Sequence, residues 1–161
     1  MTTAEYNQCV DKHSNGVYRF ILKNIKDEDK AKDIVQDAFE KMWLKVKEID
    51  FNKSKSYLFT AAYHTMIDSI RKNKNQSELD EVAFNKHSVN SEYLGLKDIS
   101  NKAVDKLPEI QKSVVLLRDY EGCSYEEIGK ITNLTESQVK VYIYRARVFL
   151  KNYIGSLDRV I

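Results

Sequence analysis

The side chains best suited to chemistry in this sequence are cationic and lie near its C-terminus, where they could bind phosphate groups. No acidic residue occurs between Glu136 and Asp158. That span contains four basic residues: Lys140, Arg145, Arg147 and Lys151. Arginine and lysine clusters of this kind are the electrostatic footprint of nucleic-acid binding. The alternative interpretation is a basic helix face that is only solvated. The elements around these residues must show which of the two interpretations applies.

Two helix starts of the same kind lie at the beginning of this region. In Ser124-x-x-Glu127 and Thr135-x-x-Gln138, the hydroxyl can accept from the third following N–H while the acid or amide reaches back. Asn133 stands between them, and asparagine tolerates the left-handed backbone that stops a helix. The pattern predicts a helix-turn-helix, in which the second helix lies in the major groove of DNA.

Apolar residues recur at helical spacing on one side of each predicted helix. The buried faces are expected to consist of Tyr125, Ile128 and Ile131 in the first helix and of Val139, Ile143, Ala146 and Leu150 in the second. Gly129 lies where two steeply crossing helices need a small side chain. The opposite side of the second helix would reach bases and phosphates through Ser137, Lys140, Val141 and Tyr144, with Arg145 and Arg147 on its flanks.

The composition indicates a soluble, all-helical protein. The chain has 161 residues, 42% of them hydrophobic, which suffices for one ordinary domain or two small ones. One proline, five glycines and no alternating strand-length runs argue against β-structure. Neither a targeting segment nor an apolar run of membrane-spanning length is present, so we expect a cytoplasmic protein. Cys9, Cys123, His13 and His87 are isolated, which predicts no metal site, disulfide or cofactor.

The N-terminal half has its clearest periodicity over residues 27–47. Apolar residues recur there every three or four positions: Ala31, Ile34, Val35, Ala38, Phe39, Met42, Trp43 and Val46. Two earlier amphipathic stretches, Thr3–Asp11 and Val17–Ile25, are expected to pack on this helix, separated at Asn15 and Gly16. A further helix is predicted from about Tyr57 to Asn73.

Residues 51–67 contain no acid and combine aromatic with basic side chains: Phe51, Lys53, Lys55, Tyr57, Phe59 and Tyr63. Such a mixture is typical of surfaces that bind single-stranded nucleic acid by stacking and phosphate contacts. Aromatic residues at helical spacing are more often core, so Phe59 and at least one other should be buried.

The middle of the chain differs in charge from both ends. Residues 76–105 carry 6 acidic and 3 basic side chains and lack sustained periodicity, which predicts a flexible linker over 76–104 with a short helix near its end. The expected fold is therefore two small helical domains, residues 1–75 and 105–161. The second domain would open at Leu107-Pro108, stop a helix at Gly122, and bury Ile110, Val114, Leu117 and Tyr120.

The combined pattern resembles a bacterial RNA polymerase sigma factor of the compact extracytoplasmic-function (ECF) group. "AKDIVQDAFEKMW" is similar to the polymerase-binding part of sigma region two, and "SYLFTAAYHTMIDSIRKNK" to its promoter-melting and −10-reading helix. Residues 107–151 are similar to region four. The three segments follow one another in the order of that family.

The resemblance implies three binding surfaces and no catalytic residue, because the polymerase performs the chemistry. Core polymerase would be bound by Asp33, Gln36, Asp37 and Lys41. The melted −10 strand would be bound by Asn52, Lys53, Ser54, Lys55, Tyr57, His64, Arg71, Lys72 and Lys74. The duplex −35 element would be bound by Ser137, Gln138, Lys140, Val141, Tyr144, Arg145 and Arg147. His64 belongs to this set by the resemblance, but a packed histidine with a satisfied ring is the favoured interpretation of this residue. Tyr63-His64 and Tyr142 replace residues that are usually more basic in this family.

The resemblance also implies core RNA polymerase and promoter DNA as partners, together with an anti-sigma factor, soluble or membrane-bound, and no small-molecule substrate. The two alternative functions are a self-contained helix-turn-helix regulator and a helical adaptor without a DNA function. The region-two pattern argues against the regulator. The acid-free recognition helix argues against the adaptor.

Overall fold

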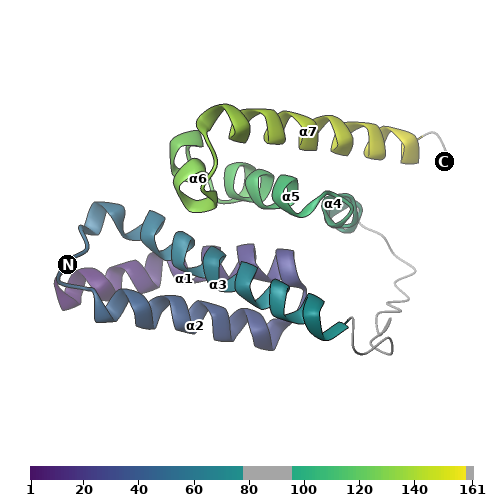
Figure 1. Ribbon diagram of the computed structural model, residues 1–161. Helices are drawn as coiled ribbons and strands as arrows, with labels where there is room; N and C mark the ends of the chain where they lie inside the picture. The colour runs from purple at the N-terminus through teal and green to yellow at the C-terminus, as the bar shows by residue number, and fades with distance from the viewer. Residues whose placement is uncertain (78–95, 159–161) are drawn as a thin grey trace.

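The structure, a computed structural model, describes residues 1–77 and 96–158, and these ranges contain helices and no strand. The all-α prediction is confirmed. Figure 1 shows the N-terminal helices as one layer and the C-terminal helices as a second layer stacked on it. The N-terminal layer consists of α1 (Thr3–Ile25), α2 (Glu28–Leu44), a 3-10 turn η1 (Phe51–Lys53) and α3 (Ser54–Ser77).

The three N-terminal helices form a bundle around large apolar side chains. Phe20 of α1, Met42 of α2 and Leu58 and Met66 of α3 are fully buried. Local sequence sets the helix starts, because Thr2 and Glu5 form a capping box and the Asp27 carboxylate accepts from the Lys30 N–H. Removing these apolar surfaces from water is the main stabilising contribution to such a bundle.

The prediction of two separate N-terminal helices is wrong. Helix α1 continues without interruption through Asn15 and Gly16. The glycine does not break the helix; it leaves room for a side chain from the other domain. A Cβ atom at Gly16 would lie 2.8 Å from Oε2 of Glu121.

The apolar stripe over residues 27–47 is only partly buried. Ala31, Ile34 and Ala38 are buried as expected, but α2 ends at Leu44, and the Trp43 side chain is 47% exposed. The Trp43 ring packs edge-on against Tyr6 at a centroid distance of 4.9 Å. The expected burial of Trp43 is wrong, because Met42, its neighbour in the same turn, takes the fully buried position and leaves Trp43 at the edge of the stripe.

The C-terminal layer contains four helices and a π-helical turn: α4 (Leu96–Asp105), α5 (Glu109–Val115), η2 (Leu116–Tyr120), α6 (Tyr125–Thr132) and α7 (Glu136–Asp158). Its core includes Val114, Leu117, Ile128 and Ile131. Helix α4 lies at the end of the predicted linker. The rest of that prediction, residues 78–95, lies outside the described residues.

The two layers pack on each other, with α6 against α3 and α5 against α1. One continuous cluster of buried side chains runs from Cys9 in α1 to Ile143 in α7. Tyr120, predicted as core, is 40% exposed, and the Lys23 ammonium lies 3.5 Å above its ring. The prediction of burial is wrong there, because Tyr120, the last residue of η2, lies outside the core and its ring is covered only by the Lys23 side chain of α1.

Candidate nucleic-acid interface

The helix-turn-helix begins with the predicted caps. Thr135 Oγ1 accepts from the Gln138 N–H at 3.1 Å, and Gln138 Oε1 accepts from the Thr135 N–H at 2.9 Å, which completes a capping box at the start of α7. At the start of α6, Ser124 Oγ accepts from the Glu127 N–H at 3.1 Å, but the Glu127 carboxylate does not reach back to the Ser124 N–H, so only half of the predicted capping box forms there. These local hydrogen bonds fix both ends of the turn.

The turn itself depends on Asn133 and Gly129. Asn133 has φ of 60°, the left-handed conformation predicted for the stop. Gly129 is buried, and a Cβ atom there would lie 2.8 Å from the backbone oxygen of Leu134. The small residue therefore permits the close approach of α6 and the turn, as its position predicted.

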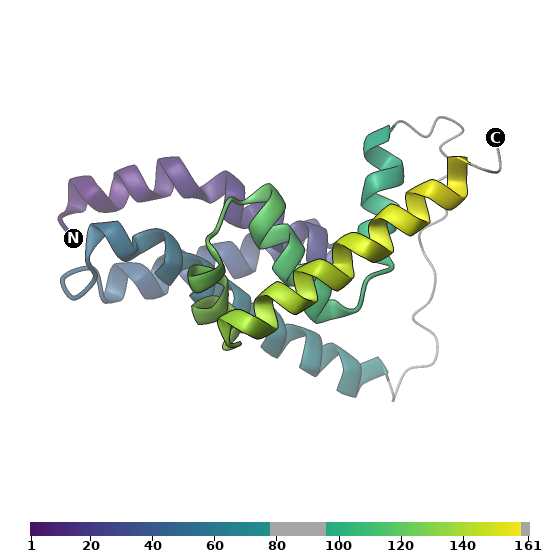
Figure 2. The same ribbon diagram turned by 90° about the horizontal axis from the view of Figure 1, so that it is seen from above.

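The orientation of α7 agrees with the predicted buried face. Val139, Ile143 and Ala146 are at most 2% exposed and face α5 and α6. The opposite side presents every residue predicted to bind the duplex, all of them exposed: Ser137, Gln138, Lys140, Val141, Tyr144, Arg145 and Arg147. Figure 2, which looks down on α7, shows this helix on the outer side of the C-terminal layer.

The cationic side chains of α7 differ in how they are held. Lys140 Nζ lies 3.7 Å from Glu136 Oε1, a solvent-exposed pair that contributes little to stability. Arg147 forms a two-pronged contact with Asp119, with Nη2 2.5 Å from Oδ1. Hydrogen bonding to Asp119 raises the pKa of Arg147. Arg147 is thereby tied to η2 of its own domain, whereas Lys140 extends from the face.

The residues predicted to bind the melted strand lie on η1 and along α3. Asn52 and Lys53 are exposed, and Lys55 and Tyr57 are half-buried. Ser54 is 2% exposed, and its hydroxyl donates to the Phe51 carbonyl at 2.7 Å, which secures the start of α3. In this structure the Ser54 hydroxyl is thus engaged inside the protein.

The second half of α3 carries the remaining residues of that set. His64 is exposed, so the favoured interpretation of a packed histidine is wrong. Its neighbour Tyr63 is buried, and burial raises the pKa of the Tyr63 hydroxyl. Arg71, Lys72 and Lys74 are exposed near the end of the helix. Phe59 is also buried, which confirms the expectation of core packing for Phe59 and one further aromatic residue.

The predicted polymerase-binding residues lie on α2. Asp33 and Gln36 are exposed. Asp37 is half-buried; its carboxylate lies 2.9 Å from Lys41 Nζ and accepts from Thr65 Oγ1 of α3 at 3.2 Å. Asp37 and Lys41 therefore also connect α2 to α3. Two large apolar residues at the end of α2, Trp43 and Leu44, are also exposed, which the periodicity did not predict because it assigned Trp43 to the apolar stripe.

The described residues contain no group of three or more His, Cys, Asp or Glu side chains that could hold a metal ion. Cys9 and Cys123 are both buried free thiols. Burial raises the pKa of Cys123 to about 11, so this thiol stays protonated near neutral pH. Among the described helices, none is long and apolar enough to cross a membrane.

Known family models match residues in both layers. The family model described as "Sigma-70 region 2" matches residues 9–76, and "Sigma-70, region 4" matches residues 101–150. The two matched segments cover most of the N-terminal bundle and most of the helix-turn-helix, in the order predicted.

Similar proteins cover nearly the whole chain. RNA polymerase sigma factor SigV of Bacillus subtilis is 30% identical over 151 residues, which are 93% of this chain and 91% of that protein. ECF RNA polymerase sigma factor SigM of the same organism is 28% identical over 144 residues, 86% of this chain and 88% of SigM. The sigma factor RpoE of Bartonella quintana, solved with the anti-sigma factor NepR, has the same fold, with a TM-score of 0.78 at 24% identity, over 93% of this chain and 96% of RpoE.

These findings define a transcription initiation factor with regions two and four of the sigma-70 type. The chain belongs to the ECF group of RNA polymerase sigma factors, which direct the polymerase to promoters.

Proposed function

We propose that this sigma factor reads the −35 element with the outer face of α7 and captures the melted −10 strand with η1 and α3. The single observation that carries the proposal is the exposure of all seven predicted α7 residues opposite a fully buried face. In the major groove, Lys140 and Arg145 would bind phosphates, while Ser137 and Tyr144 would reach base edges.

The N-terminal layer would act on single-stranded DNA. Lys53 and Lys55 supply charge for the phosphate backbone, and the half-buried Tyr57 and the exposed Asn52 flank the position of an extruded base. Arg71, Lys72 and Lys74 extend the cationic surface along α3. The chain would contribute no acid, base or nucleophile, and the polymerase would form the phosphodiester bonds.

The domain limits follow from the same proposal: residues 1–75 act as region two, 105–161 as region four, and 76–104 as the connection. The protein would work in the cytoplasm, where polymerase and DNA are found. An anti-sigma factor is a further proposed partner, supported by the ECF family and by the complex in which the Bartonella relative was solved.

Core polymerase would be bound by the exposed side of α2 through Asp33 and Gln36. Asp33 is the better residue to change, because Asp37 also holds Thr65 and its loss would disturb the packing of α2 on α3. Asp11 lies exposed on α1 and offers a charge-matched control in the same layer.

The test is size-exclusion chromatography of the protein with sigma-free core polymerase, followed by transcription from random genomic fragments. The wild type and Asp11→Lys should co-elute with the polymerase and produce discrete transcripts, while Asp33→Lys should elute separately. Binding of duplex DNA without any binding of core polymerase would instead indicate a self-contained regulator.

A further inference from the structure

Arg147 lies on the same side of α7 as residues assigned to duplex DNA. It follows Lys140 by seven residues, close to two full helical turns, and Tyr144 lies between them on that side. The Arg147 side chain is 49% exposed. Its position alone would therefore place Arg147 among the cations that contact phosphates, as the resemblance predicted.

Asp119 holds this guanidinium within the C-terminal layer. Nη2 of Arg147 lies 2.5 Å from Oδ1 and Nε lies 3.4 Å from Oδ2, so both carboxylate oxygens are used. Two bonds of this kind fix the plane of a guanidinium as well as its position. Asp119 belongs to η2, a π-helical turn in which the Glu121 N–H donates to the Leu116 carbonyl at 3.1 Å. Single π-helical turns are frequent at functional sites.

Two other cations on the exposed side of α7 have looser partners. Lys140 Nζ lies 3.7 Å from Oε1 of Glu136, beyond hydrogen-bonding distance. The guanidinium carbon of Arg145 lies 6.0 Å from the centroid of the Tyr142 ring, at the outer limit of a cation–π contact. Both side chains can therefore turn toward a phosphate without breaking a short polar contact, whereas Arg147 must first leave its carboxylate.

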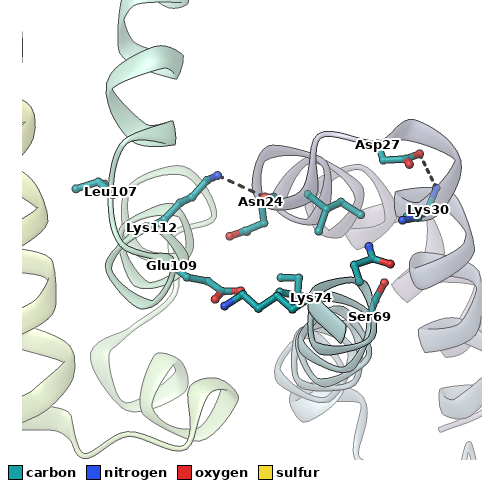
Figure 3. Close-up of a pocket in the computed structure, with 11 residues that line it drawn as sticks. Asn24, Asp27, Lys30, Ser69, Lys74, Leu107, Glu109 and Lys112 are labelled. Carbon is teal, nitrogen blue, oxygen red and sulfur yellow. Dashed lines mark hydrogen bonds between the residues drawn. The ribbon is translucent and has the colours of Figure 1, made fainter. Parts of the chain in front are cut away.

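Pairing also holds a cation elsewhere in this layer. Lys112 of α5 is 9% exposed; its Nζ lies 3.6 Å from Oδ1 of Asp105 and donates to the Asn24 carbonyl at 3.4 Å. Figure 3 shows Lys112 extending from α5 toward Asn24 on α1, and Figure 1 shows α7 on the other side of α5. Lys112 therefore points away from the duplex-binding side whatever its partners are. Arg147 differs, because the loss of its acid would release it toward DNA.

We propose that Asp119 is a specificity-determining residue that withholds Arg147 from the DNA backbone. This role rests on the proposed function, because it requires the outer side of α7 to meet the duplex. Both side chains of the pair are more than one-third exposed, so the pair contributes little to folding stability. Its effect is on binding, since phosphate contacts raise the affinity for every sequence alike and base contacts distinguish promoters. With Arg147 withheld, Ser137 and Tyr144 supply a larger share of the binding free energy.

The test is the salt dependence of the affinity of the full chain for a mixed-sequence DNA duplex. Each neutralised phosphate adds about 0.9 to the slope of log K against log salt concentration. Asp119→Asn should steepen the slope by about 0.9 and bind roughly tenfold more tightly at about 50 mM salt. Asp119→Glu retains the carboxylate and should restore the wild-type slope. Asp11→Asn, an equal change of charge at an exposed position of α1, should leave the slope unchanged.

A double-mutant cycle identifies the released group as Arg147. Arg147→Gln should reduce the slope by about 0.9 more in the Asp119→Asn background than in the wild-type background. An equal reduction in both backgrounds would overturn the withholding of Arg147. Asp119→Ser is a second neutral variant, and a wild-type slope in both Asp119→Asn and Asp119→Ser, with circular dichroism showing folded protein, would overturn it as well.

Arg145→Gln separates this role of Asp119 from the proposed function. Loss of Arg145 should flatten the wild-type slope by about 0.9. If Arg145→Gln flattens the slope while Asp119→Asn has no effect, only the withholding of Arg147 is overturned. If Arg145→Gln has no effect while the cycle shows the expected coupling, the result counts against the duplex-reading face and leaves the release of Arg147 standing.

Sequence discrimination needs a separate readout, the selection of duplexes from a random-sequence pool by the sigma factor bound to core polymerase. Asp119→Asn should enrich a preferred upstream sequence less strongly than the wild type, because its added phosphate contact is made on every sequence. Equal enrichment by Asp119→Asn and the wild type would overturn the effect of Asp119 on specificity.

Discussion

Replacing Gly129 with alanine should destabilise the helix-turn-helix. The added Cβ atom would lie 2.8 Å from the Leu134 oxygen and 4.0 Å from Cγ2 of Val139. The first contact cannot relax easily, because it involves backbone whose N–H already donates to the Gly129 carbonyl at 3.0 Å. Overpacking of this kind costs about 1–3 kcal/mol, and alanine returns about 1 kcal/mol of helix propensity. We expect a net loss of up to about 2 kcal/mol.

Gly155 provides the matched control for this substitution. It also lies in a helix, α7, but no atom lies within 4 Å of its added Cβ. Gly155→Ala should therefore raise stability by up to about 1 kcal/mol. Thermal unfolding by circular dichroism measures both variants, with a fall of up to about 8 °C expected for Gly129→Ala. A rise in Tm of equal size in the two variants would refute the tight crossing inferred at Gly129.

Three further predictions concern the C-terminal layer. Val139→Asp should unfold the C-terminal layer by burying an unpaired carboxylate, at a cost of several kcal/mol. Val141→Asp, on the exposed face of α7, should leave the layer folded. Urea unfolding distinguishes the two variants, and equal midpoints would mean that α7 is rotated. Lys140→Ala should weaken binding to promoter duplex about tenfold and leave polymerase association intact. Lys102→Ala on α4 should leave duplex binding unchanged. Fluorescence anisotropy measures both variants, and unchanged binding by Lys140→Ala would contradict the assignment of Lys140 to the duplex-binding face. Burial raises the pKa of Cys123 to about 11, so the folded state retains a proton that the unfolded state loses from about pH 9. The stability of the wild type relative to Cys123→Ala should thus fall between pH 9 and 11, and a constant difference in urea titrations would refute the burial effect.

The local signals in the sequence were sufficient for much of the fold. The hydroxyl caps at Ser124 and Thr135 and the left-handed stops at Gly122 and Asn133 involve residues within a few positions of each other, so their residue types alone predict them. The orientation of α7 could also be predicted locally, from the spacing of its apolar residues. Its outward face was therefore predictable residue by residue.

The features that the sequence did not reveal depend on distant parts of the chain. Gly16 was interpreted as a helix break, although it faces Glu121, and Arg19 and Glu121 are 102 residues apart in sequence. Tyr120 has the apolar body of a core residue, but its ring packs under Lys23 of the other layer. Periodicity describes a single helix and carries no information about which face will meet a second domain.

The continuous core has a consequence for how this protein unfolds. Since buried side chains form one cluster from Cys9 to Ile143, the two layers share part of their apolar interior. A shared interior couples the melting of both layers into a single cooperative transition, whereas separated layers would melt independently. We therefore expect the calorimetric cooperativity of this sigma factor to depend on the packing of its two layers as much as on its individual helices.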